Sequence, residues 1–268
     1  MTDFAIAGIG GRMGRALAGL IASHPYDYTL KAGFEYPAHP DLGRELALFL
    51  GESSLPGRLA AMESSALRGA EVLMEFTAPA ASLEHLALAV RTGTPVVLGT
   101  TGFSEEEEEK VKAFARQIPL LFTSNTSLGM NLMISLAGRI ATLLGSDYAL
   151  EVIEAHHDQK KDAPSGSARK LLNALAQARG LDPDKVCRHG RLGLTGPRGR
   201  DEIGVSVIRG GDIVGEHTVM FIGPGERLEL THRVQSRATF AAGALRAGVW
   251  LKDKEPGLYD MQDVLHLK

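Results

Sequence analysis

A glycine-rich turn near the start of the chain limits the possible folds more than any other feature. An apolar run over residues 4–9 leads into Gly8-Ile9-Gly10-Gly11-Arg12-Met13-Gly14, and apolar residues then recur at helical spacing as far as Ser23. A strand, a glycine turn and a helix in this order suit a dinucleotide pyrophosphate, because glycine lets the backbone approach the phosphates at a helix N-terminus. The third glycine comes one residue later than in the usual fingerprint, so the turn alone would also fit a purely structural role.

The next predicted strand, residues 28–35, ends in an acid. Glu35 lies about twenty residues past the glycines, where a carboxylate accepts hydrogen bonds from the adenosine ribose. Tyr36 follows it, and not a basic residue. Because a 2′-phosphate needs a cation at this place, we expect NADH to be preferred over NADPH, although Arg44 in the following loop could supply some charge.

Strands and helices alternate over roughly the first 125 residues, which is typical of a Rossmann-type, doubly wound parallel sheet. Further apolar strands are predicted at residues 70–77, 94–98 and 118–122. The segment Gly99-Thr100-Thr101-Gly102 follows the second of these, at the strand end where open α/β sheets bind ligands. Ser104 and Glu107 are spaced as a capping box for the helix that comes next.

The character of the sequence changes after an apolar helix predicted over residues 130–144, whose methionines we expect to fill the core. Strand-like runs follow at 203–208, 213–222 and 227–234, and in the last of them apolar and polar residues alternate, as on a sheet with one buried face. This predicts a second α+β domain with a mixed or antiparallel sheet over residues 127–237. The final helix, 238–251, is too apolar to stand free, so we expect segment 238–268 to complete a dinucleotide-binding domain formed by residues 1–126.

The stretch from Glu154 to Ser167 carries the most chemistry. An apolar run over residues 148–153 predicts a strand, and a polar loop follows it. This stretch holds the adjacent pair His156 and His157, Lys160, and a Ser-Gly-Ser turn that precedes a predicted helix. Ser165, a plausible N-cap, and the residues Gly166 and Ser167 would present backbone N–H groups to an anion. These groups indicate a carboxylate-bearing substrate that receives a proton. A zinc site is the alternative, but adjacent residues rarely point at one metal, and we expect none.

Composition excludes several classes of partner. The 268-residue chain has a net charge of −3, which gives no reason to expect binding to nucleic acid or to an anionic membrane. The single cysteine cannot form an intrachain disulfide, which fits a reducing compartment. We find no apolar run of membrane-spanning length and no room for a signal peptide, and therefore expect a cytoplasmic protein.

Together these motifs resemble the dihydrodipicolinate reductase family of bacterial and plant lysine and diaminopimelate biosynthesis. The resemblance spans nearly the whole chain, and its most specific part is the His-His pair followed by Asp-Ala-Pro-Ser-Gly at 162–166. The other matching segments are residues 8–15, Phe76-Thr77, 99–103, Asn125 with Ser127, 210–218 and 226–229.

The resemblance implies that NADH or NADPH delivers hydride to a cyclic imine dicarboxylate, 4-hydroxy-tetrahydrodipicolinate. It makes His156 the proton donor and Lys160 an assisting cation. It also implies a homotetramer assembled through the sheets of the second domain. Substrate contacts are then expected from His157, Lys160, Ser165, Gly166 and Ser167. Cofactor contacts are expected from Gly8, Ile9, Gly10, Gly11, Arg12, Met13, Glu35, Gly99, Thr100, Thr101, Thr123, Ser124, Asn125 and Thr126.

Three positions depart from the family pattern. Ser167 stands where Thr is usual, and Tyr36 replaces the basic residue of members that use both cofactors. The segment Thr123-Ser124-Asn125-Thr126 differs from the commoner Ala-Ala-Asn-Phe, which alters the expected packing around the nicotinamide. Two other functions stay open from the residues themselves: a related two-domain amino-acid dehydrogenase, and a protein that senses NADH without chemistry.

Overall fold

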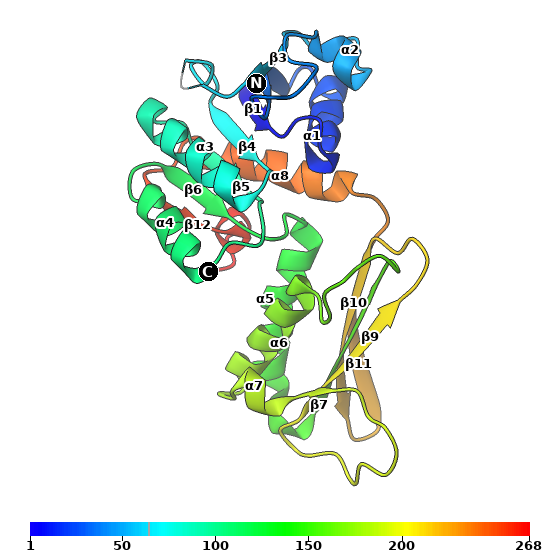
Figure 1. Cartoon of the computed structure of the whole chain (residues 1–268). Helices are drawn as coiled ribbons and strands as arrows, with labels where there is room; N and C mark the ends of the chain where they lie inside the picture. Colours follow the sequence, from blue (N-terminus) through cyan, green and yellow to red (C-terminus); the bar gives the residue numbers. More distant parts are fainter. Residues whose placement is uncertain (64) are drawn as a thin grey trace. The chain divides into compact units, whose positions relative to one another are not determined.

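The computed structural model describes residues 1–63 and 65–268, and these divide into two units (Figure 1). Unit 1 comprises Met1–Ser127 and Arg237–His266 with Lys268, and unit 2 comprises Leu128–Ser236 with Leu267. Each unit has a sheet of its own, so the chain leaves the first unit once and returns to it through its C-terminal segment.

Unit 1 is built on a seven-stranded parallel sheet with the strand order β12-β6-β5-β4-β1-β2-β3. This confirms the predicted doubly wound parallel sheet. Two of its strands, β3 and β12, were not predicted, because each has only three residues and lacks the β-branched residues that mark the equally short β5. The strands are β1 (Thr2–Ala7), β2 (Tyr28–Glu35), β3 (Leu59–Ala61), β4 (Val72–Glu75), β5 (Val96–Leu98), β6 (Pro119–Phe122) and β12 (Gly257–Tyr259).

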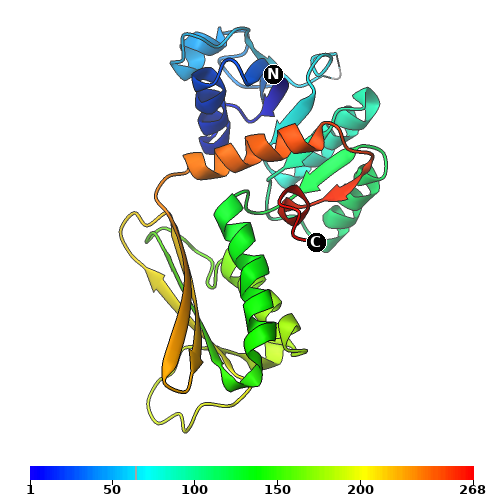
Figure 2. The ribbon, with the colours of Figure 1, turned by 180° about the vertical axis from the view of Figure 1, so that it is seen from behind.

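Helices cover both faces of this sheet. Helices α1 and α8 pack together on one face, and α3 and α4 pack together on the other, as the two opposite views show (Figures 1 and 2). The predicted capping box is confirmed, since Ser104 and Glu107 exchange hydrogen bonds at the start of α4. The helices are α1 (Arg12–Ser23), α2 (Leu46–Leu50), α3 (Pro79–Thr92), α4 (Glu105–Ala115), α8 (Ala238–Leu251) and α9 (Met261–Val264).

Unit 2 contains a five-stranded mixed sheet with the order β11-β10-β7-β9-β8, which confirms the predicted second α+β domain. Strand β10 pairs antiparallel with β11 and β7, whereas β7, β9 and β8 run parallel. The strands are β7 (Ala149–His156), β8 (Cys187–His189), β9 (Ile203–Arg209), β10 (Gly215–Gly223) and β11 (Glu226–Val234). The helices are α5 (Leu128–Leu144), the 3-10 turn η1 (Gly145–Asp147), α6 (Gly166–Ala178) and α7 (Pro183–Val186).

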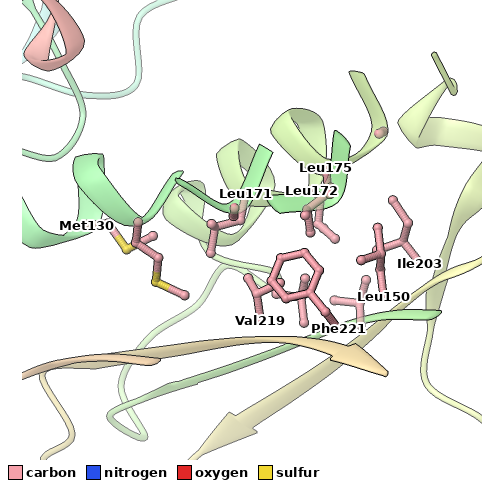
Figure 3. Close-up of a cluster of buried hydrophobic side chains, with 14 residues drawn as sticks. Met130, Leu150, Leu171, Leu172, Leu175, Ile203, Val219 and Phe221 are labelled. Atoms are coloured by element: carbon pink, nitrogen blue, oxygen red, sulfur yellow. The ribbon is translucent and has the colours of Figure 1, made fainter. Parts of the chain in front are cut away.

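The core of unit 2 lies between this sheet and the paired helices α5 and α6. Leu171, Leu172 and Leu175 of α6 meet Val219 and Phe221 of β10 in a fully packed cluster (Figure 3). The methionines of α5 belong to the same cluster, which confirms their expected role as core filler. The core therefore fixes α6, and with it the turn that begins this helix, against β7 and β10.

Three details of unit 2 differ from the predictions. Strand β7 extends to His156, so this residue ends a strand and does not lie in the predicted loop. The strand was predicted too short because its last buried residues, Glu154 and His156, are polar and give no apolar signal. Leu228, expected on the buried face, is 46% exposed at the end of β11. Finally, Leu128–Asp147 is long and apolar enough to cross a membrane by length and composition, contrary to expectation. The buried side of α5 packs in the core of unit 2, as in core helices that give the same pattern.

The close contact of α8 with the loop that follows β6 leads to a stability prediction. A Cβ on Gly243 would lie 1.9 Å from the backbone oxygen of Thr126, so Gly243→Ala should lower the free energy of unfolding by about 1–3 kcal/mol. Gly138→Ala in α5 is the matched control, because its Cβ would meet Ala174 at ordinary contact distances and should stabilise the helix by up to about 1 kcal/mol. Thermal unfolding midpoints measure both, and equal midpoints for the two variants would contradict the packing argument.

Candidate active site

In unit 1 the glycine turn follows β1 and leads into α1. Gly8 has a φ of +68°, which glycine adopts without strain, and a Cβ on this residue would lie 3.0 Å from Thr77. A Cβ on Gly14 would lie 2.3 Å from the Gly8 oxygen, so the third glycine lets α1 approach the turn closely. The glycines therefore form a backbone loop with few side chains at the N-terminus of a helix, an arrangement that can bind a pyrophosphate.

A pocket of about 750 Å³ opens beside this turn. Of the predicted cofactor residues, Gly8, Gly10, Gly11 and Glu35 line it. Glu35 accepts a hydrogen bond of 2.8 Å from the Gly10 backbone N–H, so the acid that ends β2 is held against the glycine turn. The residue types and their arrangement fit the adenosine half of a dinucleotide. The lining is completed by Arg15, Phe34, Tyr36, Pro37, His39, Asp41, Phe49, Met62, Phe76, Thr77, Ala78, Ala81, Glu84, His85 and Leu88.

The other predicted cofactor residues lie outside this lining. Ile9 is buried, and Arg12 and Met13 form the first residues of α1. Segments 99–101 and 123–126 follow the parallel neighbours β5 and β6, so both emerge at the carboxyl edge of the sheet, as does the glycine turn after β1. Within these segments the hydroxyls of Thr100, Thr123 and Thr126 form hydrogen bonds inside unit 1, as in the 2.6 Å bond from Thr126 to the Phe240 oxygen.

A buried glutamate that sequence reasoning missed joins the loop after β4 to α3. Glu75 ends β4, is fully buried, and accepts hydrogen bonds from Thr77 and Ser82 (3.0 Å from the latter) and from Nδ1 of His85 at 2.7 Å. The Ser82 hydroxyl also forms a hydrogen bond of 2.8 Å with the Thr100 hydroxyl. His85 therefore lies on α3, lines the pocket and pairs with a buried carboxylate.

In unit 2 the centre of the site is a carboxylate–imidazole pair on β7. Nδ1 of His156 lies 2.6 Å from Oε2 of Glu154, and both side chains are largely buried. The two residues are two positions apart on one strand, so their side chains project from the same face of the sheet. Because Glu154 accepts the Nδ1 proton, Nε2 is the nitrogen left to exchange a proton with a ligand.

The carboxylate of Glu154 has further partners. Both guanidinium NH₂ groups of Arg209 donate to it at 2.8 Å, and the backbone N–H of Ser165 donates at 2.9 Å. Burial by itself would raise the pKa of Glu154, but the hydrogen bonds from Arg209, His156 and Ser165 outweigh it and lower this pKa. Glu154 is therefore a fixed negative charge beneath the imidazole of His156.

Opposing influences act on His156 itself. Burial lowers the pKa of the imidazole most strongly, Glu154 raises it, and the positive charges of Lys160 and Arg209 lower it further, with a net result below the ordinary value. On β10, a Cβ at Gly215 would lie 3.2 Å from Nε2, so the missing side chain leaves this nitrogen accessible. A negatively charged ligand beside His156 would raise its pKa towards neutrality.

His217, which had no predicted role, completes the buried cluster. Its ring packs edge-on against His156 with centroids 5.3 Å apart, and its Nε2 lies 3.1 Å from the Ser165 hydroxyl. Burial, with the neighbouring His156 charge next in importance, lowers the pKa of His217 to about 4, so the ring is neutral at physiological pH. Within residues 1–63 and 65–268, its buried Nδ1 has no hydrogen-bond partner.

The loop between β7 and α6 carries the remaining predicted residues. Lys160 forms an ion pair of 2.7 Å with Asp162, and the hydrogen bond from Lys160 lowers the pKa of that acid. His157 is half-buried next to His156. Ser165 caps α6, as predicted, by accepting from the Ala168 N–H at 3.2 Å. Gly166 and Ser167 form the first positions of the helix, where backbone N–H groups favour an anion.

Three residues of this cluster lacked a predicted role, and only one of them had a usable signal. Glu154 precedes His156 by two residues, which on a strand implies a shared face. Arg209 and His217 come from strands more than fifty residues away, and they reach Glu154 and Ser165 only through sheet pairing.

Comparison with known proteins identifies related sequences along the whole chain. The family model described as the N-terminus of dihydrodipicolinate reductase matches residues 2–126, and the model described as its C-terminus matches residues 129–265. The 4-hydroxy-tetrahydrodipicolinate reductase of Magnetococcus marinus is 45% identical over 264 residues, which cover 98% of each chain. The enzyme of the same name from Syntrophobacter fumaroxidans is 44% identical over the full length of both chains.

A solved structure shows the same similarity. The dihydrodipicolinate reductase of Paenisporosarcina sp. TG-14, with dipicolinate bound, superimposes with a TM-score of 0.74 and 26% identity, and 98% of each chain is covered. An amine dehydrogenase from Mycobacterium smegmatis, with a TM-score of 0.56 and 14% identity, shares the fold alone.

The buried His217 leads to a prediction for stability against pH. Its pKa falls from 6.5 in the unfolded chain to about 4 in the folded one, so its contribution to stability is complete above pH 6.5 and is lost as the pH falls towards 4. The loss amounts to about 3 kcal/mol. Urea unfolding at several pH values should show a smaller decline for His217→Gln than for the unaltered protein. The matched control is His189→Gln, at an exposed position in β8. Equal declines in all three proteins would contradict the assignment.

Proposed function

The chain belongs to the dihydrodipicolinate reductase family, and from this premise we propose how its residues carry out the reaction. The protein is an NAD(P)H-dependent enzyme that reduces 4-hydroxy-tetrahydrodipicolinate in lysine and diaminopimelate biosynthesis. This activity decides against an amino-acid dehydrogenase and against a sensor without chemistry. The family consists of soluble biosynthetic enzymes, and we propose that this member works in the cytoplasm.

The assignment of the proton donor rests on one observation, the pairing of His156 with the buried Glu154. Glu154 holds the imidazole with Nδ1 inward, so Nε2 is the only ring nitrogen that can deliver a proton to a bound molecule. A Cβ on Gly215 would crowd Nε2 at 3.2 Å, so glycine at this position keeps a side chain from covering the nitrogen. We therefore assign His156 as the general acid, a role that contributes roughly 10²–10⁴ in rate in enzymes generally.

The protonation state of His156 follows the binding of substrate. In the free protein its pKa is below the ordinary value, chiefly because of burial. A dicarboxylate bound beside His156 adds negative charge, which raises the pKa of the imidazole. Nε2 then carries the proton that the reaction requires. Lys160, which is held by Asp162 in the free protein, would turn to the substrate and stabilise negative charge as it develops. When bound, NAD(P)H supplies the hydride.

The substrate carboxylates have a proposed site at the start of α6. The first turn of this helix presents the N–H groups of Gly166 and Ser167, and the Ser165 hydroxyl fixes the turn by capping it. Ser165 is also tied to Glu154 through its backbone N–H. Glu154 therefore contacts both the proposed anion site and the proton donor, and it holds the two at a fixed distance from each other. His157 and Lys160 add donors from the preceding loop.

For the cofactor we propose unit 1, with a preference for NADH. Glu35 lies in the pocket beside the glycine turn, where its carboxylate would accept hydrogen bonds from ribose hydroxyls and would repel a 2′-phosphate. Tyr36, the next residue, is 57% exposed and brings no positive charge. The loops at 99–101 and 123–126, at the same edge of the sheet, are proposed for the nicotinamide half.

We also propose a homotetramer that forms through the sheet of unit 2. In the described part of this unit, α5 and α6 cover one face of the sheet. The opposite face carries Ile153, Ile208, Met220 and Ile222 on its three central strands, and Ile208 is 50% exposed. Polar residues, among them Glu151 and Thr218, share this face, and a surface that combines apolar and polar residues suits an interface between subunits. Light scattering in solution tests this, and a monomer would contradict it.

The activity assay that tests the proposed roles follows NADH oxidation with freshly made product of dihydrodipicolinate synthase. His156→Ala should lower kcat by roughly 10²–10⁴, because the proton donor is lost, and Lys160→Ala should also reduce turnover severely. NADH binding, followed by fluorescence, should be unchanged in both variants because unit 1 is intact. Lys161→Ala, at the adjacent exposed lysine, is the control and should keep full activity. Normal turnover in the first two variants would disprove the assignments.

A further inference from the structure

The cofactor pocket contains one permanent positive charge that the proposed NADH site leaves unexplained. Among the described residues that line it, Arg15 is the only arginine or lysine. Within residues 1–63 and 65–268, no carboxylate lies within ion-pair distance of this guanidinium. Arg44, the cation suggested by the sequence, does not line the pocket and is paired with Asp41 at 3.2 Å. An uncompensated arginine in a concave site is suited to an anionic group of a ligand.

The guanidinium is held in place by contacts that leave its outer edge available. Nε of Arg15 donates to the Gly10 oxygen at 2.9 Å, and the guanidinium carbon lies 5.2 Å from the centre of the Phe49 ring. The Phe49 ring in turn contacts His39, with centroids 5.6 Å apart. With Nε engaged and the plane resting on an aromatic ring, the two terminal NH₂ groups remain as a fork for an oxyanion.

This fork lies close to the acid that is proposed to bind the ribose. Gly10 donates its N–H to Glu35 and accepts from Arg15 through its carbonyl, so the two side chains bracket one residue. A Cβ on Gly10 would lie 2.9 Å both from Glu35 Oε1 and from the Phe49 ring that supports Arg15. A phosphate attached to the ribose 2′-oxygen would therefore meet a negative charge at Glu35 and a positive one at Arg15.

We propose that Arg15 is the residue that binds the 2′-phosphate of NADPH, so that the protein uses NADPH as a second cofactor although Tyr36 replaces the usual cation. This inference rests on the proposed cofactor site at Glu35. The two charges act in opposite directions: Glu35 favours NADH, and Arg15 limits the penalty for NADPH. Cofactor choice in this chain then depends on a residue of the first turn of α1, and not on the residue that follows β2.

The test compares KM for NADPH and for NADH in Arg15→Gln. Loss of a charge-assisted bond to phosphate should raise KM for NADPH roughly 10- to 100-fold and leave KM for NADH within about twofold. Arg15→Lys should recover part of the NADPH affinity, because it restores the charge. In the unaltered protein, added KCl should raise KM for NADPH more than KM for NADH, and this difference should disappear in Arg15→Gln.

Arg44→Gln is the matched control, since it removes the other arginine suggested for this role and should leave the ratio of the two KM values unchanged. A selective loss of NADPH in Arg44→Gln instead of Arg15→Gln would overturn the proposal, as would equal changes for both cofactors. Direct titration of each variant with NADPH and NADH, followed by fluorescence, separates this inference from the reaction. Absence of substrate reduction would contradict the residue roles proposed for the reaction. Equal changes in the binding of NADPH and NADH by Arg15→Gln would contradict the proposed role of Arg15.

Discussion

The arrangement of the proposed substrate site depends on one buried charge, the carboxylate of Glu154. Its side chain is fully buried and accepts hydrogen bonds from His156, Arg209 and the Ser165 N–H, which belong to β7, β9 and the start of α6. Leaving such a charge without partners would cost several kcal/mol, so the three elements must come together for unit 2 to fold. The same interaction that satisfies the charge also orients the imidazole and positions the helix turn proposed for the substrate carboxylates.

Unit 1 uses a similar arrangement at the end of a different strand. Glu75 ends β4, is fully buried, and binds Nδ1 of His85 at 2.7 Å, as Glu154 binds Nδ1 of His156 at 2.6 Å. In both cases the carboxylate also accepts from a serine of the helix that follows, Ser82 or Ser165. A buried acid at the end of a strand therefore joins a helix to a loop in each unit, and leaves the outer nitrogen of one histidine for the site.

The sequence predicted those features that neighbouring residues determine. The glycine turn, the capping pair Ser104 and Glu107, and the Ser165 cap all follow from local geometry, and the alternation of strands and helices was enough for the parallel sheet. Short strands such as β3 and β12 depend on their partners and left no periodic signal. The environment of the histidines was also out of reach, because Arg209 and His217 approach only through strand pairing. The pocket position of Arg15 was also missed, since it depends on a contact with Phe49, a residue of α2 that is distant in the sequence.

The most direct test of this account is the pH dependence of kcat in Glu154→Gln, measured with NADH. In the proposed mechanism activity requires protonated His156 and therefore declines as the pH rises through its pKa. Glu154 raises that pKa, so its removal should move the decline to lower pH, while NADH binding by unit 1 should persist. Glu154→Asp, which retains the charge, should restore part of the original profile. A decline at the original pH in Glu154→Gln would show that Glu154 only supports the fold, and would contradict its proposed role in setting the proton donor.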